Sequence, residues 1–332
     1  MNIHVTRRRL TGLALLAALA SATAFTAPAN AQEPIELRFS AVFSEQDIRA
    51  EMMQRFSDAL GDGFALQPYY GGNLFKQGTE LVAMQRGNLE MGNIAPQDIS
   101  NQIPAWSILT SAYLFRDAAH LQTFFDSEAG AEMKQMVEDQ LNVKILGPTY
   151  FGSRQVGLAT EEKIDTPEDM AGIKLRMPPG EAWQFLGQAL GANPTAVAYA
   201  ETYTALQTGA IDGQDNPLPN VQNMKFYEVM SQIALTSHLV GYDLLTISLD
   251  TWAELSPEQQ EAVQSAADEA IAWSTEQHLA QEEELVAFFE EEGLEVYTPD
   301  VDAFRTYAQE QYLNSDLAAD WPEGMLDRIN GL

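Results

Sequence analysis

Strand-like and helix-like segments alternate from the start of the folded region, and this order constrains the fold more than any other feature. The hydrophobic pattern predicts a strand, a helix, a strand, a helix and a strand over residues 35–43, 46–60, 64–70, 79–86 and 89–94. Consecutive units of this kind build parallel sheets with right-handed crossovers. The sequence therefore predicts an α/β protein whose ligands gather at the carboxyl ends of its strands.

The same alternation continues to residue 249. A helix is predicted over 117–141, with a break near Asp126 and Ser127, and the start signature Thr166-Pro167-Glu168-Asp169 predicts a short helix. Further strands are predicted over 143–150, 154–160, 173–177 and 244–249, and further helices over 181–190 and 201–208. At roughly 150 residues per domain, the 332-residue length indicates about two domains with a cleft between them.

A long helix is predicted near the C-terminus. Ser256 and Gln259 form a capping box with Pro257 at the first helical position, and Gly293 ends the pattern. One apolar stripe contains Val263, Ala267, Ile271, Ser274, Leu285 and Phe289. The acidic runs 282–284 and 290–292 lie off this stripe, so we expect them to form a solvated face.

The N-terminus has the layout of a secretory signal peptide. Three arginines, Arg7 to Arg9, precede an apolar stretch over residues 10–25 and the small-x-small site that ends at Ala31. We therefore expect residues 1–31 to be removed and the mature chain to be exported to the periplasm. Residues 6–10 also resemble a twin-arginine signal, with the general secretory route as the alternative and an uncleaved anchor as a further one.

Composition excludes several classes of function. The chain has 48 Asp and Glu residues against 18 Lys and Arg, a formal net charge of −30, which disfavours binding to nucleic acid and to anionic membranes. It has no cysteine, so disulfides, thiolate metal sites and cysteine nucleophiles are excluded. The motifs of zinc proteases, serine hydrolases and nucleotide-binding enzymes are also missing. We expect binding rather than catalysis, with no metal and no cofactor, although a pair of carboxylates acting as in a hydrolase stays open.

One segment resembles a known family. Residues 172–217 read GIKLRMPPGEAWQFLGQALGANPTAVAYAETYTALQTGAIDGQDNP. They resemble the signature of the DctP-type solute-binding proteins of tripartite ATP-independent periplasmic (TRAP) transporters. Supporting matches are Leu37 to Ser40, Gly71 to Leu74, Lys225 to Val229 and Leu255 to Gln260. The resemblance covers roughly residues 35–296.

The resemblance implies a two-domain periplasmic binding protein fold that closes on a ligand. We expect domains mainly over 32–155 and 156–245. The remainder, 246–332, should hold a crossing strand, the long helix that spans both domains and C-terminal helices that pack on both.

The resemblance also implies a set of ligand-binding residues. The arginine at position 176 matches the family residue that pairs with the ligand carboxylate, for which a planar, permanently charged guanidinium is suited. Arg154 matches a second arginine near the carboxylate, and Asn216 matches a pocket asparagine that can accept from an arginine and donate to a carboxylate. The other expected contacts are Tyr199, Trp183, Gln97, Phe43, Phe151 and Tyr242.

The function that the resemblance implies is capture of a small organic acid anion by a monomeric protein, followed by delivery to an integral membrane permease. A protein that presents its ligand to a membrane receptor, or a secreted hydrolase, remains as the alternative. The ligand itself stays open among dicarboxylates, keto acids, sugar acids, aromatic acids, sulfonates and zwitterions. Pro179 stands where sialic acid binders of the family have a polar residue, which disfavours sialic acid.

Overall fold

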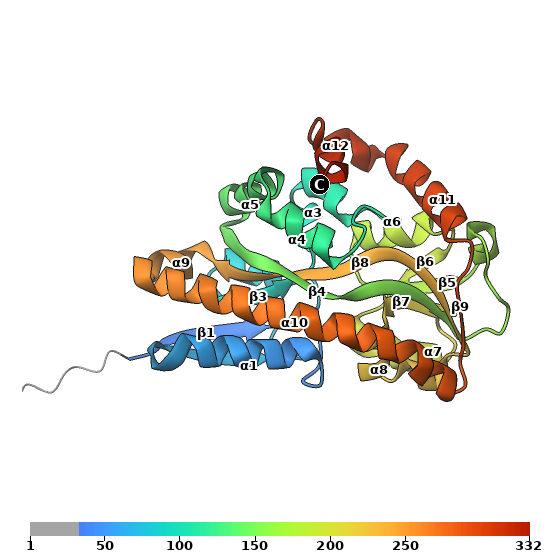
Figure 1. The fold of residues 1–332 in the computed structure, drawn as a ribbon, viewed down its shortest axis with the longest axis horizontal. Helices are drawn as coiled ribbons and strands as arrows, with labels where there is room; N and C mark the ends of the chain where they lie inside the picture. The colour runs from blue at the N-terminus through green and yellow to red at the C-terminus, as the bar shows by residue number, and fades with distance from the viewer. Residues whose placement is uncertain (1–32) are drawn as a thin grey trace, which may run out of the picture. The chain divides into compact units, whose positions relative to one another are not determined.

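The computed structural model describes residues 33–332, so the predicted signal peptide lies outside the described residues. The strands of this part of the chain form one mixed sheet in the order β2-β1-β3-β8-β4-β7-β5-β6, and β9 pairs with β8 (Figure 1). They are β1 Ile35–Ser40, β2 Phe64–Tyr69, β3 Met91–Ile94, β4 Val143–Leu158, β5 Lys174–Met177, β6 Asn193–Ala196, β7 Gly213–Pro217, β8 Gln232–Ser248 and β9 Glu295–Tyr297.

The two ends of the sheet are parallel, as the β-α-β pattern predicts. β1 pairs in parallel with β2 and β3, and β5 pairs in parallel with β6 and β7. We call the end with β1, β2 and β3 the first lobe and the end with β5, β6 and β7 the second lobe. The long antiparallel strands β4 and β8 run between them and belong to both. The expected boundaries at 155/156 and 245/246 fall inside these strands, so the division into domains at those residues stays a prediction.

The helices cover the faces of this sheet. The predicted break near Ser127 is confirmed, because the Ser127 side chain caps a new helix there. The described helices are α1 Ile48–Leu60, α2 Glu80–Gln85, α3 Pro96–Ser100, α4 Ala118–Asp126, α5 Glu128–Leu141, α6 Glu181–Ala189, α7 Thr202–Gln207, α8 Leu218–Asn223, α9 Leu249–Glu254, α10 Pro257–Glu291, α11 Val301–Leu313 and α12 Met325–Asn330. Thr166 begins only a single 3₁₀ turn, Pro167–Met170. No helix within residues 33–332 combines the length and apolar character needed to cross a membrane.

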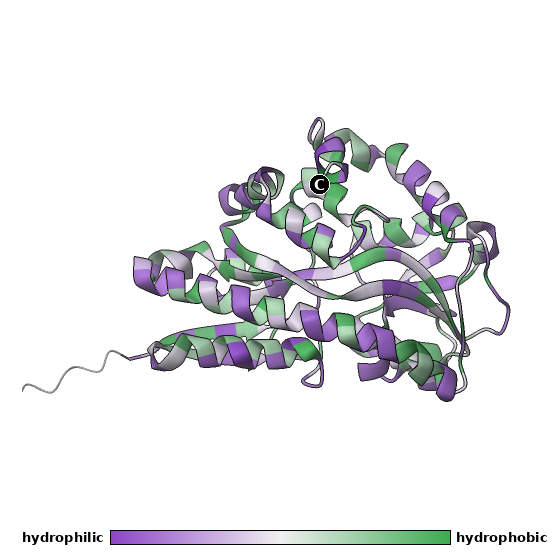
Figure 2. Ribbon diagram, in the orientation of Figure 1, coloured by the Kyte–Doolittle hydropathy of each residue, from purple (hydrophilic) through white to green (hydrophobic). Residues whose placement is uncertain are grey.

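α10 joins the two lobes. Its first half packs with α1 in one hydrophobic cluster, which contains Val263 and Ile271 from α10 and Phe56 from α1. Its last turns pack in the second lobe, where Leu285 and Phe289 lie in another cluster. Figure 1 shows α10 crossing β4 beside α1, and Figure 2 shows hydrophilic and hydrophobic residues interspersed along it. The predicted capping box and apolar stripe are confirmed.

Two strand predictions are wrong in their extent. β4 is one continuous strand of 16 residues, where two separate strands are predicted. β8 is 17 residues long, where only its last part is predicted. Nearly all residues of both strands are buried on both faces, which removes the polar alternation that marks a strand. Register shifts between Ile145 and Gly147, Tyr150 and Gly152, and Arg154 and Val156 interrupt the period further.

Candidate ligand-binding site

A small cavity lies where the carboxyl ends of strands from both lobes meet the long strands. It has a volume of about 50 Å³, whereas ligand pockets commonly measure about 300–1,000 Å³. The lining comes from the first lobe, the second lobe and β4 and β8. It consists of Val42, Phe43, Arg49, Gln77, Gly78, Glu80, Asn93, Ala95, Asp98, Phe151, Arg154, Arg176, Pro178, Trp183, Tyr199, Asn216, Asn220 and Asp243. Seven of the nine predicted contact residues are in this set.

Arg176 is the most unusual of these residues. It lies near the end of β5 and is 0% exposed. Its Nε donates to the carbonyl oxygen of Val197 at 2.8 Å. Among the described residues, neither Nη1 nor Nη2 has a hydrogen-bond partner. Burial lowers the pKa of Arg176 to about 10, so the side chain is still a cation at neutral pH.

Arg154, in β4, is held by a carboxylate. Its Nε donates to Oδ2 of Asp215 at 2.6 Å, and its Nη2 donates to Oδ1 of Asp215 at 3.0 Å. The guanidinium also lies 4.7 Å from the centre of the Trp183 ring. Burial opposes ionisation of Asp215, but Arg154 and His238 outweigh it and hold the Asp215 pKa well below its usual range. The charge of Arg154 is therefore balanced within the protein.

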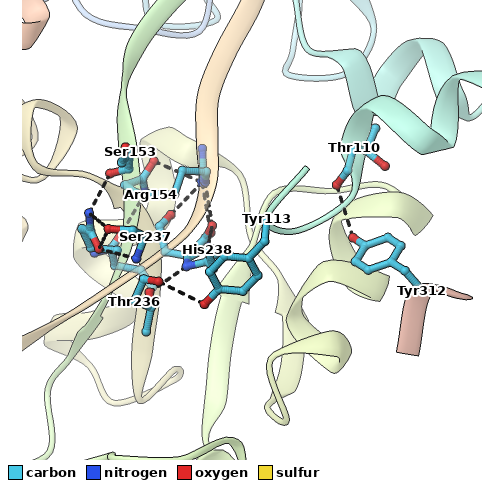
Figure 3. A network of polar contacts seen from close by, with 12 residues as sticks. Thr110, Tyr113, Ser153, Arg154, Thr236, Ser237, His238 and Tyr312 are labelled. Carbon is cyan, nitrogen blue, oxygen red and sulfur yellow. Dashed lines mark hydrogen bonds and ion pairs between the residues drawn. The ribbon is translucent and has the colours of Figure 1, made fainter. Parts of the chain in front are cut away.

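A buried network continues behind Arg154 (Figure 3). Nε2 of His238 lies 3.2 Å from Oδ2 of Asp215, and Nδ1 of His238 lies 2.8 Å from Oγ1 of Thr236. Because an ionised carboxylate can only accept, Nε2 carries the proton and the Thr236 hydroxyl donates to Nδ1. Tyr113 donates to the carbonyl oxygen of Thr236. This network fixes the orientation of Asp215, and through it that of Arg154.

Asn216 is positioned by its neighbours in β7 and β4. Its Nδ2 donates to Oε1 of Gln214 at 2.6 Å, and its Oδ1 lies 3.5 Å from Nη2 of Arg154. Tyr199 follows β6 and accepts a hydrogen bond from Asn220 through its hydroxyl. Its backbone N–H donates to Oε1 of Gln77 at 2.8 Å, which connects the second lobe to the first.

A second buried arginine, Arg49, forms ion pairs on the first-lobe side of the cavity. Nε and Nη2 of Arg49 donate to the two carboxylate oxygens of Asp47, and Nη1 donates to Oδ2 of Asp243 at 2.9 Å. The guanidinium lies 4.4 Å from the centre of the Phe43 ring and 4.2 Å from that of Phe151. Sequence reasoning missed Arg49, because Asp47 and Arg49 alone read as an ordinary helix start.

Two carboxyl groups complete the first-lobe wall. Glu80 begins α2, is 3% exposed and accepts from the backbone N–H of Thr79 at 3.0 Å through Oε2. Its Oε1 is buried and has no hydrogen-bond partner among the described residues. Burial raises the pKa of Glu80 to about 8 and that of Asp98, in α3, to about 7. No sequence signal distinguishes these two from the many other carboxylates of the chain.

Two predicted contacts lie outside the cavity. Tyr242 points to the opposite face of β8, where its hydroxyl donates to the carbonyl oxygen of Leu109 and its ring packs on Phe115 and Phe125. Gln97 is buried in α3 and is not part of the lining. In each case the next residue, Asp243 or Asp98, lines the cavity instead. In a strand this follows from the alternation of side chains between faces.

A larger hollow between α4, α5, β4 and α10 has a volume of about 890 Å³. Both of its lysines are engaged, because Lys134 donates to the carbonyl oxygen of Phe125 and Lys144 pairs with Glu138. It contains no arginine. Within residues 33–332, no group of three or more His, Asp or Glu side chains is arranged to hold a metal ion. The cavity at Arg176 is therefore the candidate site.

Comparisons with known proteins agree on one family. Residues 41–316 match the bacterial extracellular solute-binding proteins of family 7 (DctP). A TRAP periplasmic solute-binding protein from Roseobacter denitrificans, solved with bound 3-deoxy-D-manno-oct-2-ulosonic acid (KDO), is 48% identical with a TM-score of 0.88, covering 90% of this chain and 99% of that one. A second from the same species, with bound L-galactonate, is 27% identical with a TM-score of 0.81, covering 90% and 98%. The sialic acid-binding periplasmic protein of Vibrio cholerae is 35% identical, covering 64% of this chain and 66% of the relative.

Proposed function

Because this chain belongs to the bacterial extracellular solute-binding proteins of family 7, we propose that its cavity captures the anion of a small organic acid in the periplasm. The loaded protein then delivers the acid to a membrane permease of the TRAP type, the transporter class of its solved relatives. It is a solute-binding protein and not an enzyme.

The observation that carries this proposal is the state of Arg176. A buried charge without a partner costs several kcal/mol. Among the described residues no side chain accepts a hydrogen bond from either Nη atom of Arg176, and Asp215, which is engaged by Arg154, acts on Arg176 only through its charge. Its two Nη atoms form a planar pair of donors that matches the two oxygens of a carboxylate. A ligand carboxylate would satisfy both atoms and balance the charge, so we assign Arg176 the carboxylate of the ligand.

The charge balance favours one carboxylate per ligand. Of the three arginines in the lining, Arg49 is paired with Asp47 and Asp243, and Arg154 is paired with Asp215. Of these three, only Arg176 forms no ion pair with a carboxylate of the described residues. Relatives at 48% and 27% identity were solved with KDO and with L-galactonate, both monocarboxylic acids rich in hydroxyl groups. We therefore propose a polyhydroxylated sugar acid as the ligand.

The small volume of the cavity indicates that the lobes separate when ligand binds or leaves. A space of about 50 Å³ has room for little more than water molecules. The hydrogen bond from the Tyr199 backbone to Gln77 crosses between the lobes, and both lobes contribute residues to the cavity lining. Hinge closure around a ligand is an established motion of proteins with two lobes.

Calorimetry with matched sugars tests the proposal. D-Galacturonate and D-galactose differ only at C6, which is a carboxylate in the first and a hydroxymethyl group in the second, and KDO is added as the ligand of the solved relative. The protein is unfolded in denaturant, dialysed and refolded first, so that any acid from the expression host is removed. We expect binding of at least one of the two acids and none of galactose. Binding of galactose with an affinity equal to that of galacturonate, or binding of neither acid, would contradict the proposal.

A further inference from the structure

We propose that Glu80 and Asp98 form the part of the site that recognises the hydroxyl groups of the ligand and rejects a second carboxylate. This inference rests on the proposed function, because it concerns the end of the ligand that Arg176 does not hold. Both residues line the cavity from the first lobe, whereas Arg176 lines it from β5 in the second lobe.

The first support is the buried, unpartnered oxygen of Glu80. Oε2 already accepts from the Thr79 backbone, but Oε1 has no partner among the described residues and Glu80 lines the cavity. A buried polar atom that finds no partner costs about 1–3 kcal/mol. A ligand hydroxyl would supply the missing hydrogen bond.

The second support is the electrostatic surroundings of the two carboxyls. Burial is the largest influence on the pKa of each, and a neighbouring carboxylate adds to it: Asp98 for Glu80, and Asp243 for Asp98. No cation of the described chain is among those influences. This wall therefore differs from the Arg49 and Arg154 regions, where every carboxylate is paired with an arginine.

The chemistry of such a wall suits hydroxyl groups. A protonated carboxyl both donates and accepts, as a hydroxyl does, so the two can pair in either direction. Where a carboxyl of this wall is ionised, a second ligand carboxylate beside it adds a like charge with no cation to balance it, and like charges at short range are unfavourable. An acidic wall can also bind an ammonium group. Preference for a ligand with an ammonium group would therefore contradict the inference.

Three matched six-carbon acids separate these chemistries. D-Gluconate ends in a hydroxymethyl group, D-glucarate has a carboxylate at that position, and 6-aminohexanoate carries an ammonium. We expect the protein to bind gluconate at least about tenfold more tightly than glucarate, a difference of about 1.4 kcal/mol. Equal binding of gluconate and glucarate, or tighter binding of 6-aminohexanoate than of gluconate, would overturn the inference.

Substitutions test whether Glu80 and Asp98 cause the preference for gluconate over glucarate. The double variant Glu80→Gln with Asp98→Asn removes both acidic groups and keeps polar atoms, so the preference for gluconate should fall to within about threefold. Asp98→Asn alone is the second variant, because Asp98 is partly exposed and tolerates substitution more readily. Glu36→Gln, an exposed residue of β1, is the matched control. An unchanged preference for gluconate over glucarate in both variants would overturn the inference. If the unmodified protein bound no acid at all, the proposed function itself would be refuted.

Discussion

At the scale of single residues, the site is organised by which buried charges have partners. Arg154 and Asp215 are both buried, and two hydrogen bonds join their side chains. Removing one member of such a pair costs more than the pair contributes, because the other charge is left in a medium of low polarity. The pair therefore fixes the geometry of the site, while both Nη atoms of Arg176 have no hydrogen-bond partner among the described residues.

Asp215→Ala should lower the free energy of unfolding at pH 7 by about 3–5 kcal/mol, the usual cost of breaking a buried ion pair. The pKa of Asp215 is lower in the folded protein than in the unfolded chain, so its contribution is present above pH 4 and is lost as the pH falls below about 4. Urea unfolding at pH 7 and at pH 3 measures this. Asp62→Ala, at an exposed position in the turn after α1, is the control. A loss below about 1 kcal/mol at pH 7, the range of an exposed pair, would show that the pair is not structural.

The sequence predicts some of the residues that line the cavity and misses others. Arg176 and Asn216 stand in the segment 172–217 that resembles a family signature, Arg154 matches the family outside that segment, and the structure places all three in the lining. Gln97 and Tyr242 were one residue away from the lining residues Asp98 and Asp243. Glu80 could not be found, because its importance comes from burial and a missing partner, neither of which a sequence displays.

At the scale of elements, α10 is tied to β4 by a residue that the sequence places on a solvated face. Glu282 accepts from the Tyr150 hydroxyl and, at 2.6 Å, from the backbone N–H of Ser153. Burial raises the pKa of Glu282. The expectation of a solvated run over 282–284 is therefore wrong for its first residue, while Glu283 and Glu284 are exposed. The helix is thus attached at the β4 register shift beside Phe151 and Arg154.

Glu282→Ala should destabilise the protein by about 1–3 kcal/mol, because it leaves a buried N–H and a buried hydroxyl without an acceptor. Glu283→Ala, one position along and exposed, removes the same charge and should change stability by less than about 0.5 kcal/mol. Urea unfolding of the two variants in parallel measures the difference. Equal effects of the two substitutions would mean that Glu282 contributes only its charge.

The sequence predicts secondary structure correctly for elements that bury only one face. The β-α-β-α-β unit over residues 35–94 and the stripe of α10 were predicted because their apolar residues recur with a clear period. β4 and β8 were predicted incompletely because both faces are buried and the register shifts interrupt them. Of the three elements that join the lobes, the two strands were thus harder to predict than the helix.

At the scale of the described molecule, two lobes share β4, β8 and α10, and the cavity is built from both. The lobes contribute different chemistry. The second lobe supplies Arg176, and the first supplies Glu80, Asp98 and the Arg49 pair. Under the proposed function, a ligand that satisfies both sides would hold the lobes together, which would couple recognition to closure. Burial in the closed site would also strengthen the proposed contact between the carboxylate and Arg176, because the interior screens charge less than water does.

The central claim is that Arg176 binds the ligand carboxylate, and calorimetry of Arg176→Met tests it most directly. Methionine fills a similar apolar volume without the charge, so the free protein should stay folded with a melting temperature at or above that of the unmodified protein. Arg55→Met, at an exposed position on α1, is the control. We expect the affinity for KDO, or for whichever acid the unmodified protein binds, to fall by about 100-fold or more, about 2.7 kcal/mol. An affinity within about threefold of the unmodified protein would contradict the account.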